Sequence, residues 1–216
     1  MENIDCLVCH DTTGTYGKKK RNNCGYPNES VDLLKVAQNV GMPTRSNCGG
    51  CHWYGGGGDN VKHGDMSSVL ADPPRQVDVH MGELGFSCQK CHTTKAHKIA
   101  GRSTTSAVSE GTVACRDCHK KKPHDSSSQL LSQLNEHCDA IACQSCHIPK
   151  YARKVKTVVL WDWSQSGEES KMLKQTDKMV KQLSKKKGLL IKEKNLRPRY
   201  EWYNGKHRRY LKGDPV

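Results

Sequence analysis

The clearest periodic pattern lies in the last third of the chain. Side chains suited to one helical face recur there at intervals of three and four residues, and they are Met172, Leu173, Thr176, Met179, Val180 and Leu183. Ser166 with Glu169 matches a capping box, and Gly188 follows Lys187 as a stop signal. The pattern predicts a helix from the capping box to Lys187, with the apolar stripe used for packing.

Other segments give shorter signals. Residues 31–40 and 128–137 predict helices, and 189–191 predict extended chain. Residues 199–203 and 206–211 flank Asn204-Gly205, which predicts a β-hairpin with a type I′ turn. The rest of residues 1–147 has little periodicity, so the expected class is mainly α with extensive coil and a small β-hairpin near the C-terminus.

The composition leaves too few apolar side chains for an ordinary core. Only 34% of the 216 residues are hydrophobic, against about 45–50% in typical domains, and there is a single Phe. Disorder is the weaker explanation, because the chain has 4 Trp, 7 Tyr and 12 Cys. No apolar run is long enough for a membrane span. Something other than aliphatic side chains therefore fills the interior.

Ten cysteines fall into five copies of C-x-x-C-H, the attachment motif of c-type haem. The paired thiols reach the two vinyl groups of a porphyrin, and the histidine that follows lies under the iron as proximal ligand. The attachment pairs are Cys6/Cys9, Cys48/Cys51, Cys88/Cys91, Cys115/Cys118 and Cys143/Cys146. The proximal histidines are His10, His52, His92, His119 and His147. The sequence therefore predicts five covalent haem c groups with their iron.

Other cysteine chemistries explain this pattern less well. Structural zinc sites use four ligands and pair two C-x-x-C knuckles, whereas five knuckles cannot pair. Thiol redox motifs usually occur once, near a βαβ unit, and a disulfide scaffold needs no histidine at a fixed offset. Cys24 and Cys138 lie outside the motifs; a disulfide between them and two buried free thiols are equally compatible with the sequence.

Five further histidines are interleaved with the haem motifs, which is the number needed for bis-histidine ligation of every iron. The predicted distal ligands are His63, His80, His97, His124 and His137. His207 lies in the basic tail and is not expected to bind iron. His137 shares a helical stripe with Leu130 and Leu134, which would direct its ring toward a haem face.

Charge divides the chain into two regions. Residues 1–147 carry 16 Lys and Arg against 15 Asp and Glu, whereas residues 148–216 carry 19 against 7. We therefore expect a pentahaem region over 1–150 and a basic helix plus hairpin over 151–216. The basic segment would pair with haem propionates, solvate a face or attract an anionic partner. Nucleic acid is not expected, because haem c is attached outside the cytoplasm. No signal peptide precedes Cys6, so Met1 is not expected to begin the precursor.

Longer motifs resemble the octahaem tetrathionate reductase family of c-type cytochromes across nearly the whole chain. The matching segments are 5–16, 54–59, 61–66, 77–82, 99–103, 142–149, 161–164 and 202–205. The resemblance implies a periplasmic or extracellular protein with little sheet and closely packed haem pairs. In the family, seven haems are bis-histidine and one has a distal lysine. That last haem reduces oxyanions such as tetrathionate and nitrite, or hydroxylamine.

This sequence departs from the family by having five haem motifs rather than eight. By the family's order, two motifs would precede Cys6 and one would follow Val216, which would put the catalytic haem in a missing upstream segment. The chain is therefore expected to be the middle of such a protein, or else a family offshoot that kept only the electron relay. Lys18 is the nearest match to the family's lysine ligand, with Lys19 as the alternative. A solvated Lys18–Arg21 run on a loop is the competing interpretation.

The expected function is electron transfer through five haems held close enough for hopping, as the relay portion of an oxyanion reductase-like cytochrome. The alternative is a non-enzymatic conduit, such as an extracellular filament subunit or a docking cytochrome. Expected partners are redox proteins, further copies of the chain in a homo-oligomer, or the missing haem-bearing segments.

Overall fold

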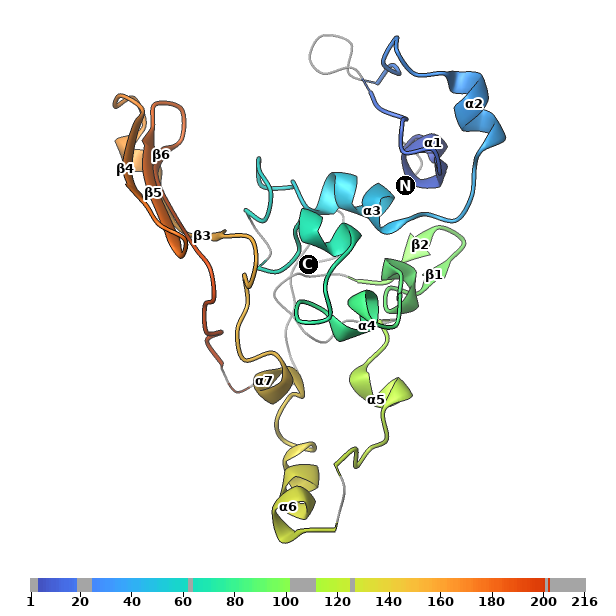
Figure 1. Cartoon of the computed structure of the whole chain (residues 1–216), viewed down its shortest axis with the longest axis vertical. Helices are drawn as coiled ribbons and strands as arrows, with labels where there is room; N and C mark the ends of the chain where they lie inside the picture. The colour runs from blue at the N-terminus through green and yellow to red at the C-terminus, as the bar shows by residue number, and fades with distance from the viewer. Residues whose placement is uncertain are drawn as a thin grey trace, which may run out of the picture. The chain divides into compact units, whose positions relative to one another are not determined.

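The computed structural model describes residues 4–18, 25–61, 64–101, 112–124, 127–200 and 202. The chain forms two compact units, each built from two stretches of sequence (Figure 1). Unit one is Met1–Cys88 with Ala152–Lys194, and unit two is Gln89–Tyr151 with Asn195–Val216. The boundary expected at residue 150 was based on haem content and charge. The two units do not test these properties, so this boundary stays a prediction.

Short helices with side-chain caps form the first stretch of unit one. They are α1 (Cys6–His10), α2 (Leu33–Gln38), α3 (Arg45–His52), the 3-10 turn η1 (Ser68–Ala71) and α4 (Val79–Gly82). Asp5, Asp32, Thr44 and Asp78 cap the four α-helices by accepting hydrogen bonds from first-turn backbone N–H groups. The helix expected within residues 31–40 is confirmed as α2.

Unit two has the same character. It contains β1 (Thr94–Lys95), β2 (Lys98–Ile99), α5 (Cys115–Cys118), α6 (Gln129–His137) and α7 (Gln144–His147), and the 3-10 turn η2 (Cys88–Lys90) precedes them. The helix expected over residues 128–137 is confirmed as α6, with Ser128 as its N-cap. The short strands β1 and β2 form an antiparallel pair.

The last stretch of unit one is a four-stranded antiparallel sheet, drawn in orange to red in Figure 1. Its elements are β3 (Thr157–Asp162), the 3-10 turn η3 (Trp163–Gln165), β4 (Lys171–Gln175), β5 (Met179–Ser184) and β6 (Gly188–Glu193). The strand order is β3-β6-β5-β4. The extended chain expected at 189–191 is confirmed within β6, and the mainly α class is confirmed only in part.

The helix expected between Ser166 and Lys187 is wrong. The backbone N–H of Thr176 donates to the Met179 carbonyl, and the Met179 N–H donates to the Thr176 hydroxyl, so the chain reverses around Asp177 and Lys178 in the middle of the periodic stretch. Pairing with β6 on one side and β4 on the other then makes β5 an interior strand. Long-range strand pairing thus overrides a local helical pattern of only moderate propensity.

Gly188 ends a turn between strands rather than a helix. Its φ is +70°, and an added Cβ would lie 2.1 Å from the carbonyl oxygen of Asp162. Only glycine fits a position that combines left-handed backbone with so close an approach. The hairpin expected over residues 199–211 lies almost entirely outside the described residues.

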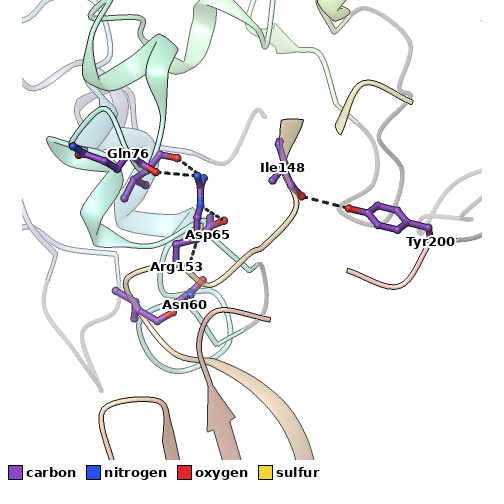
Figure 2. A network of polar contacts seen from close by, with 8 residues as sticks. Asn60, Asp65, Gln76, Ile148, Arg153 and Tyr200 are labelled. Carbon is purple, nitrogen blue, oxygen red and sulfur yellow. Dashed lines mark hydrogen bonds and ion pairs between the residues drawn. The ribbon is translucent and has the colours of Figure 1, made fainter. Parts of the chain in front are cut away.

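Three polar side chains join the sheet to the earlier part of unit one (Figure 2). The Asn60 amide donates to the carbonyl of Val155 at 2.7 Å. The backbone N–H of Arg153 donates to Asp65 at 2.8 Å, while its guanidinium donates to the carbonyls of Gln76 and Val77. The segment 60–77 is therefore fastened to the chain that leads into β3.

Candidate haem-binding site

Helical turns carry the C-x-x-C-H motifs. The motifs lie in α1, at the end of α3, in η2 and the residues after it, in α5 and in α7. Residues three apart share one face of a helical turn, so each pair of thiols is directed to the same side. No disulfide joins the cysteines that the structure describes, so their sulfur atoms are available for thioether formation with a porphyrin.

Two proximal histidines have a fixed tautomer. The Nδ1 atom of His10 lies 2.8 Å from the carbonyl oxygen of Gly41, and Nδ1 of His92 lies 3.0 Å from that of Ala100. A carbonyl can only accept, so each Nδ1 carries the proton and donates. The lone pair is then on Nε2, the atom that binds iron, and the ring orientation is set by the second nitrogen. This arrangement fits haem ligation.

His124 and His147 form the geometry of a bis-histidine pair in unit two. Their ring centroids are 6.1 Å apart and their planes differ by 9°. Two imidazoles that bind one iron from opposite faces have centroids about 6 Å apart, because each metal–nitrogen bond is about 2 Å. The residues therefore fit one haem attached at Cys143 and Cys146, with His147 proximal and His124 distal.

A buried asparagine fixes the backbone of His124. The side-chain oxygen of Asn135 accepts from the His124 N–H at 3.0 Å, and its amide nitrogen donates to the His124 carbonyl at 2.8 Å. Asn135 is only 4% exposed. Cys138 lies one turn further along, where its sulfur is 3.9 Å from Nδ1 of His124 and donates to the carbonyl of Leu134 at 3.3 Å. The sequence signals did not single out Asn135; its spacing within α6 was the available clue.

Two arginines from different segments bind backbone carbonyls on either side of His80. This histidine lies in α4, where the Arg45 guanidinium donates to the Met81 carbonyl at 2.7 Å and to the Phe86 carbonyl at 3.0 Å. Arg153 donates to the Val77 carbonyl on the preceding side. Arg45 begins α3, the helix that carries the second haem motif, so this network joins the His80 segment to that helix.

The remaining predicted distal ligands differ in their surroundings. His97 forms the tip of the β1–β2 turn with Ala96, and both have positive φ, 61° and 47°. Non-glycine residues adopt this backbone only at a cost of about 1 kcal/mol or more, and such strain is common at functional sites. His137 is exposed at the last position of α6. His63 and His207 lie outside the described residues, as does Cys24, the other half of the disulfide considered with Cys138.

Attachment cysteines of successive motifs lie close enough to perturb one another. Burial and then the nearby Cys51 raise the pKa of the Cys9 thiol, which links motifs one and two. A hydrogen bond with Cys88, followed by burial, raises the pKa of the Cys48 thiol, which links motifs two and three.

The same relationship continues into the last motifs. Burial and then Cys143 raise the pKa of the Cys115 thiol, with a smaller contribution from Cys91. These contacts join motifs three, four and five within unit two. Within each unit, the attachment cysteines of successive motifs are therefore neighbours.

Lys18 lies beside the first haem motif but is already paired. Its Nζ is 2.9 Å from Asp5 Oδ2 and 3.1 Å from the carbonyl oxygen of Gly25. The Tyr16 hydroxyl donates to the same carboxylate, and this bond, then Lys18, holds the pKa of Asp5 below its usual value. An ammonium in this pair is not a ligand. Lys18 as a distal ligand stays a prediction, and Lys19 lies outside the described residues.

The described part of the chain has a very small apolar core. Its buried hydrophobic residues are Val36, Val61, Val77, Ala152 and Leu190. Large apolar side chains remain open to solvent instead, among them Leu34 at 69%, Met42 at 76% and Leu130 at 66% exposed. Porphyrins are large flat apolar groups, and their burial against such side chains would supply the missing core. The residues therefore fit several haem groups.

Comparison with known proteins also indicates a c-type cytochrome. A family model described as bacterial cytochrome c matches residues 158–216. Among solved structures, an octahaem cytochrome c from Shewanella oneidensis is 41% identical with a TM-score of 0.80, over 99% of this chain and 47% of that one. An uncharacterized protein of Archaeoglobus fulgidus is 28% identical over 51% of this chain and 42% of its own length. This chain thus spans less than half the length of these relatives.

The motifs on helical turns and these similarities define a multihaem c-type cytochrome. The chain is similar throughout its length to the Shewanella octahaem protein, and this similarity supports haem c with its iron as the cofactor. Within the described ranges, no helix has both the length and the apolar character needed to cross a membrane.

Proposed function

We propose that the chain is the electron-relay portion of an octahaem oxyanion reductase-like cytochrome and carries five haem c groups. The observation behind this proposal is that attachment cysteines of successive motifs lie near one another: Cys9 near Cys51 and Cys48 near Cys88 in unit one, and Cys115 near Cys143 and Cys91 in unit two. Haems attached at neighbouring cysteines are close neighbours themselves. A continuous row of close haems suits electron hopping along the chain.

The protein's own residues would fix and tune each haem. The ten motif cysteines anchor the porphyrins, and His10, His52, His92, His119 and His147 bind iron on the proximal side. The iron supplies one-electron chemistry when bound. The chain sets the potentials through axial ligation, burial and hydrogen bonds to the ligands. Gly41 and Ala100 act in this way by accepting the Nδ1 protons of His10 and His92.

Distal ligation by histidine completes the proposal. His124 pairs with His147 across one iron, and His63, His80, His97 and His137 serve the other four. A strong imidazole on both faces keeps iron six-coordinate, so its ligation changes little between oxidised and reduced forms. Such sites favour fast electron transfer over substrate binding.

Reduction of a sulfur or nitrogen oxyanion would then occur on a haem outside these 216 residues. The chain spans 47% of the octahaem cytochrome that it resembles, which leaves room for the remaining motifs. Lys18 could serve that haem only after leaving Asp5 and losing a proton, which burial beside a haem would favour. Because haem c is attached outside the cytoplasm, we expect the protein in the periplasm or outside the cell.

One observation favours the alternative, a non-enzymatic conduit. The Lys18 ammonium is held by both Asp5 and the Gly25 carbonyl, so the described residues offer no neutral amine ligand there. A conduit that works with redox proteins or with copies of itself in a homo-oligomer needs no such ligand. A filament would require electron exchange at both ends of the row.

Mass and reoxidation together test the proposal. Denatured protein should exceed its polypeptide mass by five haems, roughly 3 kDa. After reduction with dithionite, the chain alone should be reoxidised no faster by tetrathionate, nitrite or hydroxylamine than by buffer. The longer natural protein should be reoxidised rapidly by one of them. Rapid reoxidation of this chain would contradict the relay role, and inert longer protein would favour the conduit.

A further inference from the structure

Unit one carries a dense set of lysines on its sheet. Residues 171–194 contain nine lysines and two acidic residues. One lysine is neutralised, because Lys194 Nζ lies 2.6 Å from Asp177 Oδ1. The ion pairs formed among the described residues include none from the other eight. This part of the sheet therefore has a net positive charge, distributed over both faces and the turns, and Glu193 and Asp162 are the carboxylates on the same face as Lys181.

The strand register places part of this charge on one face. Lys174 is opposite Lys181 across β4 and β5, Lys181 is opposite Ile191 in β6, and Ile191 is opposite Leu160 in β3. Residues directly opposite each other in antiparallel strands lie on the same face. A second row pairs Lys171 with Leu183. We call these six residues the lysine face: Leu160, Lys171, Lys174, Lys181, Leu183 and Ile191.

The charge pattern is not explained by the sheet itself. Like charges directly opposite each other destabilise a sheet. Lysines on an edge strand can prevent unwanted strand pairing, which accounts for Lys171 and Lys174 in β4. Lys181 lies in the interior strand β5, where no such protection is needed. An anionic partner would remove the repulsion between Lys174 and Lys181.

The neighbouring apolar residues indicate what kind of partner fits. Leu160 is 46% exposed and lies in the same row as the opposed lysines. Apolar contact flanked by charged residues is the usual composition of a protein–protein interface. A protein surface with carboxylates around an apolar spot therefore complements this face.

The sheet is also joined to the second haem motif. Asn60 donates to the Val155 carbonyl just before β3, and Lys187 Nζ lies 3.5 Å from the carbonyl of Gly57 (Figure 2 shows Asn60). Gly57 and Asn60 both follow His52 closely in the chain. A partner bound to the lysine face would therefore be connected, through the sheet, to the segment that follows the second haem motif.

We propose that the lysine face docks an acidic electron-transfer protein that exchanges electrons with the haem attached at Cys48 and Cys51. The proposal rests on the electron-transfer function given above. One electron passes from the reduced partner to one ferric haem, so the partner is oxidised by one electron and the iron becomes ferrous. Opposite charges steer the encounter and raise its rate, with a strong dependence on salt.

Reduced flavodoxin, a small acidic electron carrier, is the probe. Its second-order rate constant for reducing the haem-loaded chain would be measured by stopped flow at low and high salt. The variant K174Q/K181Q should lose about three- to tenfold of that rate at low salt and little at high salt. The matched control is K95Q/K98Q, which removes another opposed lysine pair, from the β1–β2 hairpin. Absorption spectra should show all haems intact in both variants.

The outcomes separate docking from electron transfer itself. If both variants slow the reaction equally, net charge rather than this face steers the partner, and the proposal is wrong. An unchanged K174Q/K181Q rate also overturns it. The proposal is also wrong if K174Q/K181Q weakens only the binding of phosphatidylglycerol vesicles or duplex DNA, because that result would assign the face to another partner. A chain whose haems accept no electrons even from dithionite would instead contradict the proposed function.

Discussion

Asn135 and His124 are joined by two hydrogen bonds between one side-chain amide and both polar groups of one backbone residue. Both bonds form in a buried site, where an amide left unpaired costs about 1–3 kcal/mol. They fix the position from which the His124 ring lies parallel to that of His147. With His124 as the proposed distal ligand, Asn135 would act on the haem through that histidine, without touching the iron.

We expect Asn135→Ala to loosen His124 and convert one haem partly to a high-spin form. Electron paramagnetic resonance and the visible spectrum would report this change, which a purely structural role would not produce. Gln133→Ala, on the exposed side of α6, is the control and should leave the spectra unchanged. A destabilised Asn135→Ala protein with fully low-spin haems would assign Asn135 to folding alone.

Replacing His124 by Ala should affect one haem, the one attached at Cys143 and Cys146. The other haems should stay low-spin, because the 6.1 Å pair joins His124 to His147 and to no second proximal histidine among the described residues. Magnetic circular dichroism would count the high-spin haems. His207→Ala should produce none; a high-spin haem in that variant would make the distal assignment wrong.

The haem motifs could be recognised in the sequence because covalent attachment needs a fixed local spacing of five consecutive residues, and the iron-binding role of their histidines stays a prediction. The helices α2 and α6 were predictable for the same reason, since their caps and periodicity are local. The sheet was not. The segment from Met172 to Leu183 satisfies a helical period. It forms strands because β5 pairs with β6, which comes later in the sequence. Asn135 was missed because its role depends on a contact eleven residues away.

The Tyr16–Asp5 bond predicts a loss of stability at high pH. Burial and then the hydrogen bond to Asp5 raise the pKa of Tyr16 from 10.0 to about 12. The neutral phenol is the form favoured by folding, so its stabilisation is complete below pH 10 and is lost as pH rises toward 12. Chemical denaturation between pH 9 and about 12 should show this fall in the natural protein and a smaller one in Tyr16→Phe. Equal slopes would mean that the bond does not couple to folding.

The same cluster of Asp5, Tyr16 and Lys18 should also lose stability at low pH. The pKa of Asp5 is lowered by its bonds to Tyr16 and Lys18, so the folded state favours the carboxylate. Its contribution is present above the unfolded pKa of about 4 and disappears as pH falls below that value. Asp5→Asn should remove this acid-dependent step, measured by denaturation from pH 6 to about 2. An acid step of unchanged size in that variant would assign it to other carboxylates.

Gly188 tests whether the sheet forms as described. An alanine Cβ there would meet the Asp162 carbonyl oxygen at 2.1 Å, in addition to adopting φ near +70°. Gly167 also has positive φ, +100°, but an added Cβ has no neighbour within 4 Å. Gly167→Ala should cost only backbone strain, about 1 kcal/mol, whereas Gly188→Ala should cost clearly more because β6 must move away from β3. Thermal or denaturant unfolding of the haem-loaded protein measures both. Had residues 166–187 been a helix ending at Gly188, that glycine would have no contact with Asp162. The two variants would then lose similar stability, and that result would contradict the strand pairing.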